Sequence, residues 1–217
     1  MPDYAEQRFN MVACQVLASG VTDERILAAM RKVERERFVP ALKRSVAYAE
    51  AAVEVVARRY LMDPRTFALT LNAAGIYAGD KVLDVGCATG YSTAVLSELA
   101  KRVIGLEQDA DLVRIASEII QGLNLTNIAI VQGSLAGGFK AEAPYNVIFV
   151  NGSIEIVPQP LLAQLAHGGR LVAAVGTQTR ARATVYLNEN GRIGHRATFE
   201  AAAPALAGFR QPVGFVF

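Results

Sequence analysis

The sequence contains few of the residues that would build a metal centre or a disulfide scaffold. Its 217 residues include two cysteines, two histidines and no tryptophan. Cys14 and Cys87 form neither a C-x-x-C pair nor a cluster with a histidine. A structural zinc site requires several such ligands, and a disulfide framework requires cysteines at close spacing. We therefore expect no metal site and no disulfide framework.

A strong excess of either charge is also absent. Lysine and arginine together number 22 and aspartate and glutamate 20, so the net charge is +2. A nearly balanced chain gives no electrostatic argument for nucleic acid as a partner. No apolar run approaches the roughly 20 residues that span a bilayer. Met1-Pro2-Asp3 lacks the basic start of a signal peptide. We expect a cytoplasmic protein with neither a nucleic-acid nor a membrane partner.

Apolar residues are abundant, at 52% of the chain against 19% charged residues. This composition predicts a large buried core. In the N-terminal part of the chain, apolar spacing and cap residues predict helices over residues 3–19, 22–33 and 64–76. Residues 46–58 are rich in Ala, Val and Glu, and their pattern is compatible with either a helix or a strand.

After residue 79 the pattern changes to short apolar strands that alternate with helices. The strands are expected at 81–85, 102–106, 128–131, 145–150, 169–175, 182–188 and 213–217. The helices between them are expected at 91–99, 109–122 and 158–166. This alternation indicates an α/β fold with a seven-stranded, mostly parallel sheet, helices on both faces and an N-terminal helical extension.

A glycine turn follows the first of these strands and reads D-V-G-C-A-T-G-Y. Gly86 and Gly90 allow the backbone to bend sharply and to approach a ligand closely. In an open α/β sheet, ligands bind at the carboxyl ends of the strands. Glu107 ends the next strand about 20 residues further on, the position at which a carboxylate binds ribose hydroxyls. The turn and Glu107 together predict a nucleoside-containing cofactor.

Asp84 helps to identify that cofactor. The turn reads G-x-A-x-G rather than the dinucleotide pattern G-x-G-x-x-G. If the Asp84 carboxylate faces the turn, it repels a pyrophosphate and favours S-adenosylmethionine, which carries a sulfonium and an ammonium group. The alternative is that Asp84 is a capping or turn residue.

Four stretches resemble the protein-L-isoaspartate O-methyltransferase family of class I S-adenosylmethionine-dependent methyltransferases. They are V-T-D-E-R-I-L-A-A-M-R-K-V-E-R-E-R-F-V-P at 21–40, V-L-D-V-G-C-A-T-G-Y at 82–91, A-P-Y-N-V-I-F-V at 143–150 and I-V-P-Q-P-L-L-A-Q-L-A-H-G-G-R-L-V-A-A-V-G at 156–176. The resemblance implies a Rossmann-like fold, with an S-adenosylmethionine-binding unit at 79–217 and a helical segment with an acceptor-side loop at 1–78, packed as one compact unit.

The resemblance also implies the reaction, which is methylation of a carboxylate of a protein or peptide substrate, with S-adenosylhomocysteine as product. The residues implied in cofactor binding are Asp84, Val85, Gly86, Cys87, Ala88, Gly90, Glu107, Gln108, Ser134, Leu135 and Asn151. Two positions differ from the family's usual residues. Ala88 replaces a glycine of the turn, and Ser134 replaces an acidic residue placed near the adenine.

The acceptor-side segment departs further from the family pattern. The family's serine position is Met62 and its threonine position is Tyr60, whereas two family glycines are Val56 and Arg58. A thioether cannot donate a hydrogen bond. We therefore assign no catalytic residue, although Tyr60 and Asp63 are the polar neighbours of Met62.

Two alternatives stay open from the sequence. Both stand beside methylation of a protein or peptide carboxylate. The first is a methyltransferase with another acceptor, and the second is a non-catalytic descendant that binds the cofactor or a partner protein. Arg58, Arg59 and Arg65 favour an anionic acceptor if they converge, but arginines near a helix start are more often solvated.

Overall fold

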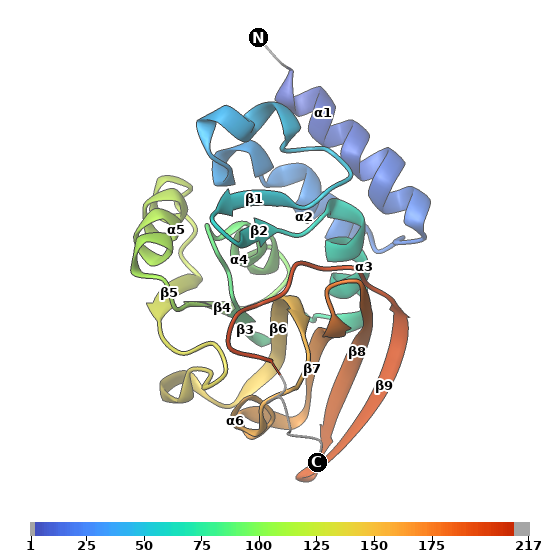
Figure 1. Cartoon of the computed structure of the whole chain (residues 1–217), viewed down its shortest axis with the longest axis vertical. Helices are drawn as coiled ribbons and strands as arrows, with labels where there is room; N and C mark the ends of the chain where they lie inside the picture. Colours follow the sequence, from blue (N-terminus) through green and yellow to red (C-terminus); the bar gives the residue numbers. More distant parts are fainter. Residues whose placement is uncertain (1–2, 211–217) are drawn as a thin grey trace, which may run out of the picture.

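The computed structural model describes residues 3–210. Its centre is a seven-stranded sheet, drawn in the lower half of Figure 1. In spatial order the strands are β5 (Ile128–Gln132), β4 (Arg102–Glu107), β3 (Lys81–Val85), β6 (Tyr145–Ile154), β7 (Leu165–Thr177), β8 (Arg180–Glu189) and β9 (Arg192–Glu200). The first five are parallel, and β8 and β9 are antiparallel to their neighbours. The expected mostly parallel sheet is confirmed.

The strand order reverses beside β3. The chain passes from β3 to β4 and β5 on one side, then returns to β6 on the other side of β3. The carboxyl ends of β3, β4 and β6 therefore surround the crevice in which doubly wound sheets bind ligands. The glycine turn leaves β3 at this crevice.

The helices precede and alternate with the strands. The α-helices are α1 (Tyr4–Met11), α2 (Glu24–Lys32), α3 (Pro64–Ala74), α4 (Tyr91–Ser97), α5 (Ala110–Gly122) and α6 (Gln159–Leu162). A π-helical turn and four 3-10 segments also occur: Val12–Val16, Leu17–Ser19, Arg35–Phe38, Ala41–Val46 and Lys140–Glu142. Asp23, Asp63 and Asp109 cap α2, α3 and α5 by accepting backbone N–H groups of the first turn.

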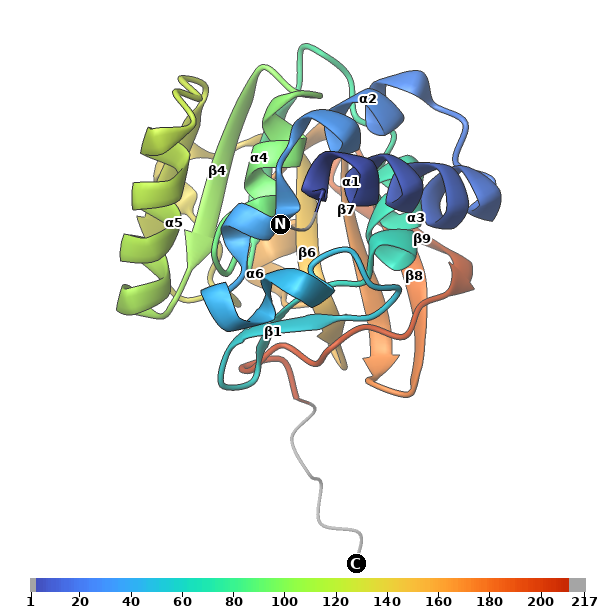
Figure 2. The ribbon, with the colours of Figure 1, turned by 90° about the horizontal axis from the view of Figure 1, so that it is seen from above.

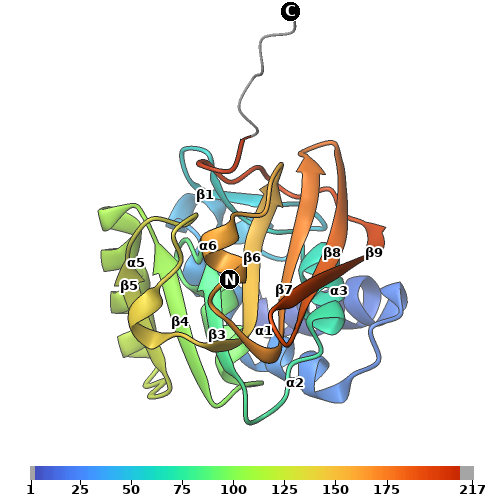
Figure 3. The same ribbon diagram turned by 90° about the horizontal axis from the view of Figure 1, so that it is seen from below.

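The two faces of the sheet are covered by different elements. Alternate strand residues point to opposite faces, so Val82 and Val147 pack with α2, α3 and α4, whereas Leu83 and Ile148 pack with α6. Figure 2 shows α1 to α5 on the first side of the sheet, and Figure 3 shows α6 on the second. The N-terminal helices therefore share the hydrophobic core of the first face with the sheet.

Residues 46–58, which the sequence left between helix and strand, contain neither a full helix nor a strand of the main sheet. They end in β1 (Val53–Val56), which pairs with β2 (Arg59–Leu61) in a separate antiparallel hairpin. The hairpin residues Val53, Val55 and Leu61 have buried side chains. Figure 1 shows the hairpin between the N-terminal helices and the sheet.

Several expected bounds near the C-terminus are wrong. The helix expected over 158–166 is only the single turn α6, because Leu165 already belongs to β7. The last described strand is β9, a segment for which the sequence predicted no strand. This strand lies at the sheet edge and is mostly exposed, so it lacks the apolar alternation that marks a strand. The strand expected at 213–217 lies outside the described residues.

No helix within residues 3–210 is long and apolar enough to cross a bilayer.

Arg170 provides a test of the link between α3 and the sheet. Its guanidinium donates to the carbonyl of Ala74 at 2.6 Å and to the Asp80 carboxylate at 2.7 Å. Both charged groups are mostly buried. Arg170→Met leaves Asp80 without its cation, so we expect the free energy of unfolding to fall by about 3 kcal/mol in urea titrations. Arg114→Met, which breaks an exposed pair with Glu118, should cost no more than about 0.5 kcal/mol. Equal losses in the two variants would contradict this role for Arg170.

Candidate functional site

The glycine turn after β3 is a tight left-handed loop. Gly86, Ala88 and Gly90 have φ angles of 78°, 51° and 94°. The N–H groups of Gly86 and Cys87 both donate to the carbonyl of Leu106, at 2.9 and 3.2 Å. Ala88 therefore adopts a conformation that glycine adopts without steric cost, which explains the family's preference for glycine there.

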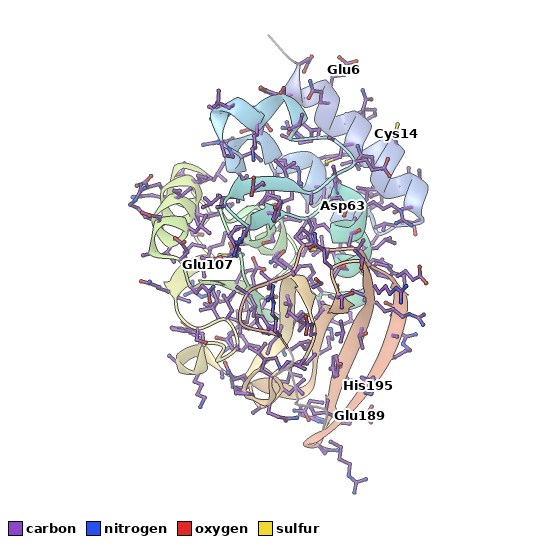
Figure 4. All side chains as sticks on the ribbon, viewed as in Figure 1. Glu6, Cys14, Asp63, Glu107, Glu189 and His195 are labelled. Atoms are coloured by element: carbon purple, nitrogen blue, oxygen red, sulfur yellow. The ribbon has the colours of Figure 1, made fainter. Side chains whose placement is uncertain are left out.

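Glu107 lies beside this turn, as the sequence predicts, and its side chain is fully buried. One carboxylate oxygen accepts the N–H of Ala88 at 3.0 Å, and the other accepts the N–H groups of Gln108 and Asp109 at 2.8 and 3.2 Å. Figure 4 labels Glu107 within the fold, whereas Cys14 and His195 lie on outer elements. The turn thus orients the carboxylate through backbone donors.

The Asp84 carboxylate is bound by side chains of the protein in the described conformation. Strand alternation places its carboxylate under the turn, toward α4, where it is fully buried. It accepts hydrogen bonds from the hydroxyls of Ser92 and Thr93 at 2.7 and 2.6 Å, and from the amide of Asn151. Burial raises the pKa of Asp84 to about 7, and these three donors limit the rise. Asp84 therefore joins β3, α4 and the end of β6, which agrees with the alternative of a local structural residue.

The other residues implied in cofactor binding lie at the same edge of the sheet. Gly133 donates its N–H to the Glu107 carbonyl at 2.9 Å, which brings the turn of Ser134 and Leu135 next to β4. Ser134 and Gln108 are exposed, whereas Val85, Cys87 and Leu135 are buried. Burial also raises the pKa of the Cys87 thiol, which argues against a reactive thiolate.

Arg59 is the site residue that the sequence analysis missed. The arginines at 58, 59 and 65 do not converge: Arg58 and Arg65 are exposed, but Arg59 is buried and contacts Glu107. In a strand, Arg59 and Leu61 share one face, and Leu61 is also buried. The inward direction of Arg59 was detectable only after the hairpin had been recognised.

The acceptor-side residues are held mainly by structural contacts. Met62 is buried, and its carbonyl accepts a hydrogen bond from Arg35 at 2.7 Å. The Arg35 guanidinium also lies over the ring of Tyr91, 4.7 Å from its centroid. Asp63 accepts the N–H of Thr66 at 2.8 Å as the cap of α3. We therefore see no acid or base at Asp63 beyond this capping role.

Within the described residues, no group of three or more His, Cys, Asp or Glu side chains could hold a metal ion.

Comparisons with known proteins agree on one family. Residues 7–202 match the family model described as protein-L-isoaspartate(D-aspartate) O-methyltransferase. The protein-L-isoaspartate O-methyltransferase of Methanoculleus marisnigri is 36% identical over 187 residues, which are 86% of this chain and 85% of that protein. The protein of the same name from Rhodopseudomonas palustris is 39% identical over 181 residues, 83% of each chain.

Solved structures show the same fold. One protein-L-isoaspartate O-methyltransferase superposes with a TM-score of 0.81 and 25% identity over 94% of this chain and 66% of that chain. A Plasmodium falciparum protein described as a methyltransferase of this type, in complex with S-adenosyl-L-homocysteine, has a TM-score of 0.79 at 21% identity over 92% of this chain and 97% of its own.

The raised pKa of Asp84 predicts a pH dependence of stability. In the unfolded chain an aspartate has a pKa of about 4, so between about pH 4 and pH 7 the folded protein binds more protons than the unfolded chain. This contribution to stability is complete below the unfolded pKa and is lost as the pH rises through about 7.

We expect the unfolding free energy of the wild type, measured relative to Asp84→Asn, to fall from about pH 5 to pH 7 and then to level off. The slope is bounded by about 1.4 kcal/mol per pH unit. Asp111→Asn controls for the loss of an exposed carboxylate. A difference between the wild type and Asp84→Asn that rises with pH would contradict the buried, partly protonated state.

Proposed function

Because this chain belongs to the protein-L-isoaspartate(D-aspartate) O-methyltransferase family, we propose that it methylates a carboxylate at isoaspartyl residues of a protein or peptide. It is an S-adenosylmethionine-dependent methyltransferase, and S-adenosylhomocysteine is the product of the reaction. The observation that carries the proposal is the Glu107 carboxylate, held by backbone donors beside the turn that leaves β3. This is the place at which a doubly wound sheet binds a nucleoside.

The proposed acceptor requires no general base, because a carboxylate is already ionised at neutral pH. The histidines of the chain are engaged away from the turn. His167 accepts the N–H of Asn190, and His195 stacks on Tyr186. A reaction between an ionised acceptor and a methyl donor depends mainly on holding the two in line. A turn without a neighbouring histidine is therefore compatible with the proposal.

We propose the cofactor contacts by position. Gly86, Ala88 and Gly90 form the turn around the cofactor, Glu107 and Gln108 bind the ribose, and Ser134 and Leu135 lie on the adenine side. Val85, Cys87 and Asn151 complete the wall. Asp84 supports this wall from beneath through Asn151 and α4.

The cavity between the turn and the acceptor-side segment is small in the described conformation. The cavity bounded by Gly86, Asn151 and Met62 has a volume of about 10 Å³, which is room for about one water molecule. Pockets for ligands of cofactor size measure about 300–1,000 Å³. Tyr60 and Phe67 also line this cavity, so the acceptor-side residues meet the turn across a space too small for a ligand of cofactor size.

A second candidate is methyl transfer to a different acceptor. The observation that favours it is Met62, which directly follows the β1–β2 hairpin. Its side chain is buried, and it places a thioether where the family has a serine hydroxyl. Tyr60, which is half-buried and lines the same cavity, is the hydroxyl nearest in sequence. An acceptor that forms a hydrogen bond with the Tyr60 hydroxyl would need a different shape from one that forms a hydrogen bond with a serine.

A pair of peptides separates the two candidates. We expect transfer of the labelled methyl group of S-adenosylmethionine to an isoaspartyl peptide, and none to the aspartyl peptide of the same sequence, at saturating cofactor. The label should be released by mild base, because the product is a methyl ester. Cofactor binding without transfer to the isoaspartyl peptide would exclude this acceptor and leave the second candidate.

Met62→Ser tests whether the serine position alone determines acceptor binding. We expect no gain in methyl transfer, because Tyr60, Val56 and Arg58 also differ from the family pattern. We expect a loss of about 2–3 kcal/mol in the free energy of unfolding, since a buried side chain is truncated. Parallel rate and urea measurements check both results. A clear gain in rate would show that a hydroxyl at this position suffices.

A further inference from the structure

The contact between Arg59 and Glu107 is the feature that family membership does not explain. Arg59 reaches from β2 and donates two parallel hydrogen bonds to the two carboxylate oxygens, at 2.6 and 2.5 Å. The Arg59 side chain is 10% exposed and that of Glu107 is 0% exposed. A bidentate arginine–carboxylate pair combines charge with two aligned hydrogen bonds and is among the strong polar contacts of proteins.

Glu107 has no acceptor position left for a ribose. A carboxylate offers about four lone-pair sites. The two Arg59 nitrogens and the N–H groups of Ala88, Gln108 and Asp109 already use them. Ribose hydroxyls reach this carboxylate only if Arg59 leaves, since the three backbone donors belong to the turn and to the end of β4.

Leu206 narrows the same crevice. A Cβ atom built on Gly86 would lie 3.1 Å from Leu206 Cδ2 and 3.5 Å from Arg59 Nη2, so both side chains cover the bare backbone of the turn. The backbone around Leu206 is fixed to β6 through Ser153, with two hydrogen bonds of 2.8 and 2.9 Å. Figures 1 and 2 both show this C-terminal segment running beside the β1–β2 hairpin.

The hairpin that carries Arg59 is not hydrogen-bonded to the main sheet as a strand. β1 and β2 pair only with each other among the described strands, and their turn contains the exposed Arg58 with a φ of 63°. Withdrawal of Arg59, by rotation of its side chain or by a shift of the hairpin, therefore breaks no hydrogen bond of the seven-stranded sheet. Arg59 also originates from the segment whose sequence departs most from the family pattern.

We propose that Arg59 is an internal competitor of the cofactor. The described structure is a closed form in which the guanidinium holds the ribose-binding carboxylate, and S-adenosylmethionine binds when Arg59 releases Glu107. The donors from Ala88, Gln108 and Asp109 remain on the carboxylate in both forms. The apparent affinity for the cofactor is reduced by the fraction of molecules in the open form, so Arg59 sets that affinity. This inference rests on the assignment of S-adenosylmethionine as the cofactor.

Calorimetric titration of the full chain with S-adenosylhomocysteine tests the competition. Arg59→Met keeps an unbranched apolar side chain but removes the guanidinium. We expect this variant to bind the ligand at least about tenfold more tightly than the wild type. Arg58→Met removes the neighbouring exposed cation and should bind like the wild type. Arg59→Lys keeps the charge but loses the bidentate geometry, and we expect an intermediate affinity.

The outcomes separate the inference from the proposed function. Equal or tighter binding by the wild type relative to Arg59→Met overturns the competition and leaves the cofactor assignment intact. Absence of binding in the wild type and in both Arg59 variants at millimolar ligand overturns the cofactor assignment and the proposed function. Thermal unfolding first checks that each variant is folded. If Arg59→Met is not, Arg59→Lys decides, since tighter binding than the wild type supports the competition and equal or weaker binding overturns it.

Discussion

The ion pair between Arg59 and Glu107 joins the N-terminal hairpin to the edge of the sheet where the strand order reverses. A buried carboxylate requires a cation or several donors, because removal from water penalises its charged form. Here Glu107 has both, the donors from the turn after β3 and the cation from β2. The hairpin, the turn and the end of β4 consequently hold one another in place.

Other buried charged groups near the crevice also have partners within the chain. Asp84 binds the two hydroxyls of the first turn of α4 and the amide of Asn151, and thereby ties three elements together. Arg35, also fully buried, donates to the carbonyls of Ala47 and Met62. A ligand that binds here must exchange some of these contacts for its own.

Much of the fold could be predicted because its signals are local. The strand expected at 81–85 is found with those bounds, since a short apolar run ending in a glycine turn is a distinctive pattern. The position of Glu107 was predictable from the length of one strand–helix–strand unit. Other features carried weaker signals. β9 is polar and exposed on an edge, and the hairpin at 53–61 is too short for either periodicity to show.

Strand alternation from Val82 predicts Asp84 on the α4 face, but its bonds to Ser92, Thr93 and Asn151 became visible only in the structure. The sequence by itself therefore determined the family, the parallel sheet, the glycine turn and the carboxylate beside it. Each of these depends on residues close together in the chain. Only the tertiary structure decided that Arg59, 48 residues away from Glu107, is the partner of that carboxylate. The pairing of two buried charges depends on their distance in space and on their removal from water, and neither quantity has a periodic trace in the sequence.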